Sequence, residues 1–172
     1  MAGFVPKSNS PEKDLVMTPS WLASDIMSHF AVEGFYLDPC KGEGAFYDCY
    51  ESTNKDYCEL SEGIDFLDYQ GKADWIVTNP PWSKMRQFLV KGMDVANNIV
   101  YLTTINHYTT KRRMSDIRNM GFGVKEIFCV PTPPKPWPAL GFQLGAVHLQ
   151  KGYKGDTKIT WHSQVTTKGE QK

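Results

Sequence analysis

The chain has 172 residues, 41% of them hydrophobic and 13% aromatic, and its 19 Lys and Arg residues balance 19 Asp and Glu residues. This length and apolar content suffice for one sizeable core, so we expect a single domain. No apolar run approaches the roughly 18 residues of a membrane span, and the first residues lack the apolar core of a signal peptide. We therefore expect no membrane contact and a cytoplasmic location.

The charges are unevenly distributed along the chain. Residues 1–82 contain 5 Lys and Arg against 14 Asp and Glu, whereas residues 83–172 contain 14 against 5, so the halves carry formal charges of −9 and +9. This asymmetry indicates a basic half that could face phosphates. The four cysteines and four histidines reproduce no zinc-ligand spacing, so we expect free thiols and no metal site.

The predicted elements alternate between helices and strands. Residues 1–14 are predicted to be a flexible arm and residues 166–172 a flexible tail, which leaves 15–165 as the domain. In chain order we predict a helix that starts at Thr18-Pro19 and runs to Phe30, a strand at 34–38, a helix at 45–50, strands at 56–60 and 75–78, a helix at 85–95, a strand at 99–105, a helix at 111–120 closed by Gly121, and strands at 124–130 and 142–150.

This order of elements predicts the fold class. Strands that alternate with helices indicate an α/β fold with a mostly parallel sheet and helices on both faces. The last strands follow one another without a long helix between them, so we expect an antiparallel edge there.

Residues that directly follow a strand are the candidates for a ligand site, because ligands of open α/β sheets bind beyond the carboxyl ends of the strands. The first strand leads into Asp38-Pro39-Cys40-Lys41-Gly42-Glu43-Gly44-Ala45-Phe46. The glycines permit a tight turn and the close approach of a ligand. The segment matches neither GxGxxG nor a Walker loop, and Asp38 suits a sulfonium or ammonium group better than a pyrophosphate.

Acidic residues also follow the second strand. Glu59 could accept hydrogen bonds from a ribose diol. Shortly afterwards, Asp65 could accept a hydrogen bond from an adenine amine, and the neighbouring Phe66 could stack on the base. Together with the glycine turn, these residues favour a nucleoside-containing ligand.

The third strand ends in Asn79-Pro80-Pro81-Trp82. The Asn79 amide and the Pro80 carbonyl offer two acceptors that the rigid prolines can aim at one point. Trp82 adds a flat face beside them. A planar substrate with an exocyclic NH2 group fits this arrangement, since the acceptors take its two hydrogens and make its nitrogen more nucleophilic.

The pairing of Asp-Pro-x-x-Gly-x-Gly-x-Phe at 38–46 with Asn-Pro-Pro-Trp at 79–82 resembles the S-adenosylmethionine-dependent amino-methyltransferases, particularly the adenine-N6 DNA methyltransferases. The resemblance covers about residues 15–150. It implies a Rossmann-like methyltransferase fold with a seven-stranded sheet, S-adenosylmethionine as cofactor, and a target adenine flipped out of DNA. Cys40 and Lys41 depart from the family pattern, which more often has small residues there.

The resemblance also implies a role for each matching residue. Asp38, Pro39, Cys40, Gly42, Gly44 and Phe46 would line the methionine end of the cofactor, as would Thr18 and Pro19 from an additional N-terminal motif. Glu59 would bind the ribose, and Asp65 with Phe66 the cofactor adenine. Asn79, which also borders the cofactor, would bind the target amine with Pro80. Pro81 would stiffen this catalytic turn, and Trp82 would stack on the target base.

Two basic segments are candidates for nucleic-acid contacts. Lys111, Arg112 and Arg113 lie close to Tyr108, and cations beside an aromatic ring suit a phosphate backbone. The proline-rich segment 131–141 contributes Lys135 and Trp137. No separate target-recognition domain is evident, so recognition would come from these loops, from a partner or from a homodimer.

Other substrates remain open at this point. RNA adenine, cytosine N4 and a protein glutamine all suit similar Asn-Pro-Pro-aromatic turns. A member of another functional class is also possible: an inactive scaffold that keeps the fold and binds nucleic acid. A compact methyltransferase of this kind would suit a virus or a mobile element.

Overall fold

The computed structural model describes residues 16–165. Seven strands form one sheet in the order β2-β1-β3-β4-β6-β5-β7. Every strand runs in the same direction except β6, which is antiparallel to both of its neighbours. The strands are β1 (Tyr36–Asp38), β2 (Lys55–Tyr57), β3 (Ala73–Thr78), β4 (Ala96–Thr104), β5 (Phe122–Cys129), β6 (Leu144–Lys151) and β7 (Lys158–Trp161).

This topology confirms the predicted mostly parallel sheet. The antiparallel strand β6 is the third strand from one edge of the sheet, because it lies between β4 and β5. The edge strand β7 is parallel to β5 and was not placed by the sequence patterns. Its four residues are too short for a clear period-2 signal.

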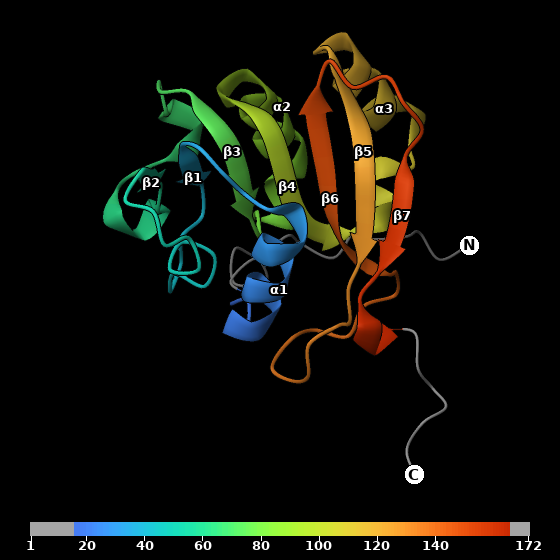
Figure 1. Ribbon diagram of the computed structural model, residues 1–172, viewed down its shortest axis with the longest axis horizontal. Helices are drawn as coiled ribbons and strands as arrows, with labels where there is room; N and C mark the ends of the chain where they lie inside the picture. Colours follow the sequence, from blue (N-terminus) through green and yellow to red (C-terminus); the bar gives the residue numbers. More distant parts are fainter. Residues whose placement is uncertain (1–15, 166–172) are drawn as a thin grey trace, which may run out of the picture.

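Helices cover both faces of the sheet (Figure 1). Helix α1 (Ser20–Phe30) packs on one face, and α2 (Met85–Val95) and α3 (Lys111–Asn119) pack on the other. Successive residues of β4 alternate between the two cores: Ile99 belongs to the α2 and α3 side, and Val100 to the α1 side. Within residues 16–165, no helix is long and apolar enough to cross a membrane.

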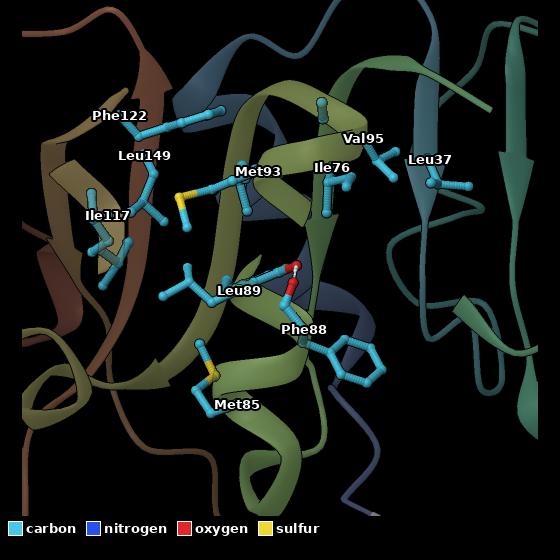
Figure 2. Close-up of a cluster of buried hydrophobic side chains, with 14 of the residues drawn as sticks. Leu37, Ile76, Met85, Phe88, Leu89, Met93, Val95, Ile117, Phe122 and Leu149 are labelled. Atoms are coloured by element: carbon cyan, nitrogen blue, oxygen red, sulfur yellow. Dashed lines mark hydrogen bonds between the residues drawn. The ribbon is translucent and has the colours of Figure 1, made fainter. Parts of the chain in front are cut away.

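Helix α2 shows how the sequence period produces this packing. Its apolar residues recur at helical spacing, and Figure 2 shows Met85, Phe88, Leu89 and Met93 on the side of the helix that meets the sheet. The Tyr101 hydroxyl from β4 donates a 2.8 Å hydrogen bond to the Phe88 carbonyl. This contact ties α2 to the central strand, and α2 follows directly on the Asn-Pro-Pro-Trp segment.

The predicted helix at 45–50 is wrong, because these residues form successive turns. The Lys55 ammonium donates to the carbonyls of Tyr47 and Tyr50 at 2.8 and 2.7 Å, so these acceptors are satisfied from outside the segment. Six residues are also too few for a helix without strong packing. Two boundaries differ as well: Pro19 rather than Thr18 occupies the N-cap of α1, and β2 ends at Tyr57, before Leu60 begins a 3-10 helix.

Candidate functional site

A cavity of about 300 Å³ lies beyond the carboxyl ends of β1, β2 and β3. Eight of the predicted site residues line it: Pro39, Cys40, Gly42, Glu59, Asp65, Phe66, Asn79 and Pro81. A smaller hollow, of about 40 Å³, shares several of these residues and adds Thr18 and Phe46. The fold therefore brings together residues from three strand ends and the segment before α1.

The structure adds lining residues that the sequence patterns did not indicate. Val16 and Met17 line the cavity from the segment before α1, and Leu60, Ile64, Lys84 and Phe88 complete its wall. Phe88 lies within the predicted helix at 85–95, which the sequence patterns did not connect with the site. Leu60 and Ile64 are exposed apolar side chains beside two acids, a combination that could have signalled a ligand surface.

Asp38 lies behind the cavity rather than in its wall. Its side chain is 0% exposed. Oδ1 accepts hydrogen bonds from the Thr78 hydroxyl at 2.7 Å and from the Cys40 N–H at 3.1 Å. Within residues 16–165, Oδ2 is buried with no hydrogen-bond partner. Burial raises the pKa of Asp38 to about 7, although the hydrogen bonds from Thr78 and Cys40 act to lower it. The carboxyl group can therefore exist in either protonation state near neutral pH.

Glu59 holds the glycine turn in place. Its Oε2 accepts a 2.8 Å hydrogen bond from the Gly42 N–H, and Oε1 accepts from the Ser61 N–H and hydroxyl. Burial favours the neutral acid, but the hydrogen bonds from Ser61 and Gly42 outweigh it and lower the pKa of Glu59. Three of the roughly four acceptor positions of this carboxylate are therefore used, which leaves about one for a ligand hydroxyl.

The backbone at Gly42 favours glycine. Its φ angle is +52°, and an added Cβ would lie 3.3 Å from the Met17 sulfur. The positive φ angle therefore favours glycine here, and a side chain would also require the Met17 thioether to shift slightly. This contact joins the N-terminal segment to the turn and forms one side of the cavity.

Asp65 and Phe66 stand at another wall. The Asp65 Oδ1 caps the 3-10 helix Phe66–Asp68 by accepting from the Leu67 N–H at 2.9 Å. Phe66 is buried, and its ring lies 5.3 Å from the ring of Phe88. A planar apolar ligand could pack between these rings and Ile64, with the Asp65 carboxylate at its polar rim.

Asn79 is half-buried directly after β3, and it lines both the cavity and the smaller hollow. Its Nδ2 donates a 2.9 Å hydrogen bond to the Val16 carbonyl. A carbonyl can only accept, so this bond determines which end of the amide is the nitrogen. The opposite end, Oδ1, is an acceptor whose position is fixed by a contact between residues 63 positions apart.

Trp82 occupies the first turn after the two prolines and packs against the core on the α1 side. Its indole N–H donates to the Leu102 carbonyl at 3.1 Å, which fixes the ring plane. The ring of His107 lies 6.4 Å away, and burial together with Arg113 lowers the pKa of His107. This lowering favours the neutral form of the imidazole that lies near the tryptophan.

The residues predicted to contact nucleic acid divide into two groups. Lys111, Arg112 and Lys135 are exposed, as predicted, and Arg113 is half-buried. Tyr108 and Trp137 are only 4% and 5% exposed, and Trp137 belongs to the core on the α1 side. The prediction of Tyr108 and Trp137 as surface contacts is therefore wrong for this conformation.

Several residues that line the cavity fit a nucleoside-containing cofactor such as S-adenosylmethionine. Its wall provides the carboxylates of Glu59 and Asp65 for a cationic nucleoside, and the rings of Phe66 and Phe88 for a base. Its volume falls at the lower end of the range for small-molecule sites. No group of His, Cys, Asp and Glu residues within 16–165 could hold a metal ion.

No family model matches the chain, and no curated protein matches it significantly. Solved structures do match. A proposed RNA methyltransferase from Pyrococcus horikoshii has a TM-score of 0.58 and 17% identity, over 77% of this chain and 81% of that one. A proposed class I S-adenosylmethionine-dependent methyltransferase from Listeria monocytogenes has a TM-score of 0.61 and 11% identity, over 90% and 68%.

The M protein of the EcoKI type I restriction enzyme is also similar. It has a TM-score of 0.59 and 14% identity over 80% of this chain, which spans only 44% of the M protein. At these identities the likeness concerns the fold. The chain has the Rossmann-like fold of S-adenosylmethionine-dependent methyltransferases.

Proposed function

We propose that the chain transfers a methyl group from S-adenosylmethionine to the exocyclic N6 amine of adenine in DNA. The observation that carries this proposal is the Asn79 amide, which lines the cavity with Nδ2 anchored on the Val16 carbonyl. The remaining polar atom, Oδ1, is an acceptor, and an exocyclic amine is a donor. The site is therefore suited to an NH2 group rather than to a carbonyl or a phosphate.

The residues have distinct roles in this proposal. S-adenosylmethionine would supply an electrophilic methyl carbon, whose bonding electrons stay on sulfur as the methyl leaves. Asn79 Oδ1 and the Pro80 carbonyl accept the two N–H hydrogens of the amine and direct its lone pair towards that carbon. The amine nitrogen then loses one proton to water. Pro81 stiffens the turn, and Trp82 stacks on the target base.

The cofactor end of the cavity supports the same assignment. Glu59 fixes the turn through Gly42 and has about one acceptor position left for a ribose hydroxyl. Asp65 accepts from the cofactor adenine amine, with Phe66 beside the ring. Thr18, Phe46 and Cys40 border the smaller hollow, which suits the methionine end.

A nucleic acid is favoured over a protein substrate because the second half of the chain is basic, and DNA is favoured because the Asn-Pro-Pro-Trp segment resembles that of the adenine-N6 DNA methyltransferases. An adenine inside a duplex has to be flipped out to reach the cavity. RNA adenine is the second candidate, favoured by the similarity of fold to a proposed RNA methyltransferase over most of its length. A partner subunit or a second copy could add target recognition.

The test is the transfer of radiolabelled methyl groups to duplex DNA, single-stranded DNA, RNA and a protein extract, followed by nucleoside analysis. We expect N6-methyladenine in DNA. Label found only in RNA, cytosine or glutamine would mean that this group, and not DNA adenine, is the substrate. The absence of both methyl transfer and cofactor binding would refute an enzymatic function.

The variant Asn79→Ala tests the role of the amide. Turnover should fall at least about 100-fold, the effect of removing one well-placed polar group from a transition state, whereas cofactor affinity should stay nearly unchanged. Asn119→Ala, at an exposed position near the end of α3, is the matched control. An equal loss of cofactor affinity in Asn79→Ala would mean that the amide has only a structural role.

A further inference from the structure

Two strongly exposed aromatic side chains lie at the same edge of the sheet as Asn79. Phe142 is 62% exposed and Trp161 is 52% exposed. Trp161 is the last residue of β7 and pairs with Cys129 at the end of β5. Phe142 comes just before β6, whose first residue Leu144 pairs with Thr104 at the end of β4. Both rings therefore stand at the carboxyl edge, which is the lower edge of the sheet in Figure 1.

The sheet order places these rings along a row. From Asn79 after β3, the strands follow as β4, β6, β5 and β7. Strands lie about 5 Å apart, so Phe142 and Trp161 start from backbones about 10 Å apart, and Trp161 starts about 20 Å from Asn79. The segment before β6 is held in place, because the Gln143 carbonyl accepts from the Ile105 N–H and the Gln143 amide donates to Val130.

Between β4 and β7, cations outnumber carboxylates along this row, although Asp25 of α1 lies 2.9 Å from His162 and so stands beside Trp161. The segments of the second half that lie at the carboxyl edge are 82–84, 105–113, 130–143 and 161–165. They contain Lys84, Lys111, Arg112, Arg113 and Lys135, and no Asp or Glu.

The described acids of this half lie elsewhere. Asp94 is in the last turn of α2, and Asp156 precedes β7, so both are at the opposite edge. Asp116 pairs with Arg86, and Glu126 accepts a hydrogen bond from Thr160 within the sheet. The part of the carboxyl edge from β4 to β7 therefore has an excess of cations and attracts a polyanion, whereas Glu59 and Asp65 lie at the part formed by the other strands.

We propose that this edge binds an unpaired nucleic-acid strand whose bases stack on Phe142 and Trp161 while its phosphates face Lys111 and Arg112. Exposed aromatic rings beside cations are the means by which proteins hold single strands, since every base offers a face for stacking and the backbone is anionic. The inference rests on the proposed function, and it narrows the substrate to single-stranded or locally opened nucleic acid.

A second copy of this chain is the rival occupant. Among residues 16–165, strand β7 pairs with β5 alone, and Ile159 on it is 59% exposed, so a further strand could add there. A twofold contact over the carboxyl edge, where Phe142 and Trp161 lie, would however bring the cations of two copies together with few carboxylates to offset them. The charge therefore favours an anionic partner.

The test measures binding of a fluorescently labelled 12-nucleotide single strand and of a hairpin duplex of the same sequence, without cofactor, by anisotropy at one salt concentration. We expect the single strand to bind more tightly. Phe142→Leu and Trp161→Leu should each weaken single-strand binding at least about fivefold, the lower limit for one stacked base. Trp161→Phe should stay within about twofold of the unmodified chain, because it keeps a ring.

Ile159→Ala is the matched control, since it removes exposed apolar surface two residues earlier on the same strand. Leucine variants that bind like the unmodified chain would overturn the proposal. Equal losses in Ile159→Ala, tighter binding of the duplex, or a stable dimer by light scattering that Trp161→Leu dissociates would also overturn it. The binding assay does not depend on turnover. If the chain binds single strands through these rings but transfers no methyl group, the proposed function is refuted and the binding proposal is not.

Discussion

Replacing Asp38 with asparagine should remove a pH dependence from the stability of the cofactor-free chain. The carboxyl group is fully buried, Oδ1 accepts two hydrogen bonds, and Oδ2 has no partner within residues 16–165. Burial is the main cause that raises its pKa from 3.8 to about 7. In the unfolded chain the same group titrates near its ordinary value.

The sign and size of the effect follow from these two values. Between about pH 4 and pH 7 the folded state keeps a proton on Asp38 that the unfolded state has lost, so stability falls as the pH rises through this window. Above about pH 7 both states are ionised and the contribution is constant. The two pKa values differ by about three pH units, which corresponds to about 4 kcal/mol of unfolding free energy.

The assay is urea unfolding from pH 4 to pH 8.5 on the unmodified chain, on Asp38→Asn and on Asp156→Asn, which removes an exposed carboxylate. As the pH rises, the unfolding free energy of the unmodified chain should fall by about 4 kcal/mol relative to that of Asp38→Asn. The Asp156→Asn control should track the unmodified chain. Parallel curves for the unmodified chain and Asp38→Asn would refute the reasoning about the buried carboxyl group.

Three further predictions concern other parts of the molecule. Burial lowers the pKa of His148 from 6.5 to about 4, so the unfolding free energy should fall by about 3 kcal/mol as the pH drops from about 6.5 to about 4. In urea unfolding experiments, His148→Gln should remove most of this fall. Trp82→Phe loses the hydrogen bond to Leu102, which should cost about 1 kcal/mol and lower the Tm by a few degrees while turnover is largely kept; a large loss of turnover would contradict simple stacking. Replacing Lys111 and Arg112 together by alanine should make the slope of log binding constant against log salt concentration for a single strand shallower by about 1.4. An unchanged slope would show that these residues do not contact the strand.

Local patterns in the sequence determined most of the framework. The apolar period predicted α2 with the bounds that the structure has, and runs of β-branched and aromatic residues located six of the strands. The position of Asn79 directly after β3 also follows from the sequence, since a strand that ends in Asn-Pro-Pro cannot continue. These features depend on residues that are neighbours in the chain, which is why they could be predicted.

Contacts between distant residues decided the rest. Lys55 reaches back to the carbonyls of residues 47 and 50 and replaces a predicted helix by turns. The core takes up Trp137, whose proline-rich surroundings indicated an exposed loop. The amide of Asn79 is oriented by the carbonyl of Val16, far away in the sequence. Phe142 and Trp161 lie at the same edge because β6 runs antiparallel to β5 whereas β7 runs parallel to it. Composition and period describe what each segment tends to form, whereas the orientation of a side chain and its exposure depend on which segments pack together, and only the tertiary structure contains that information.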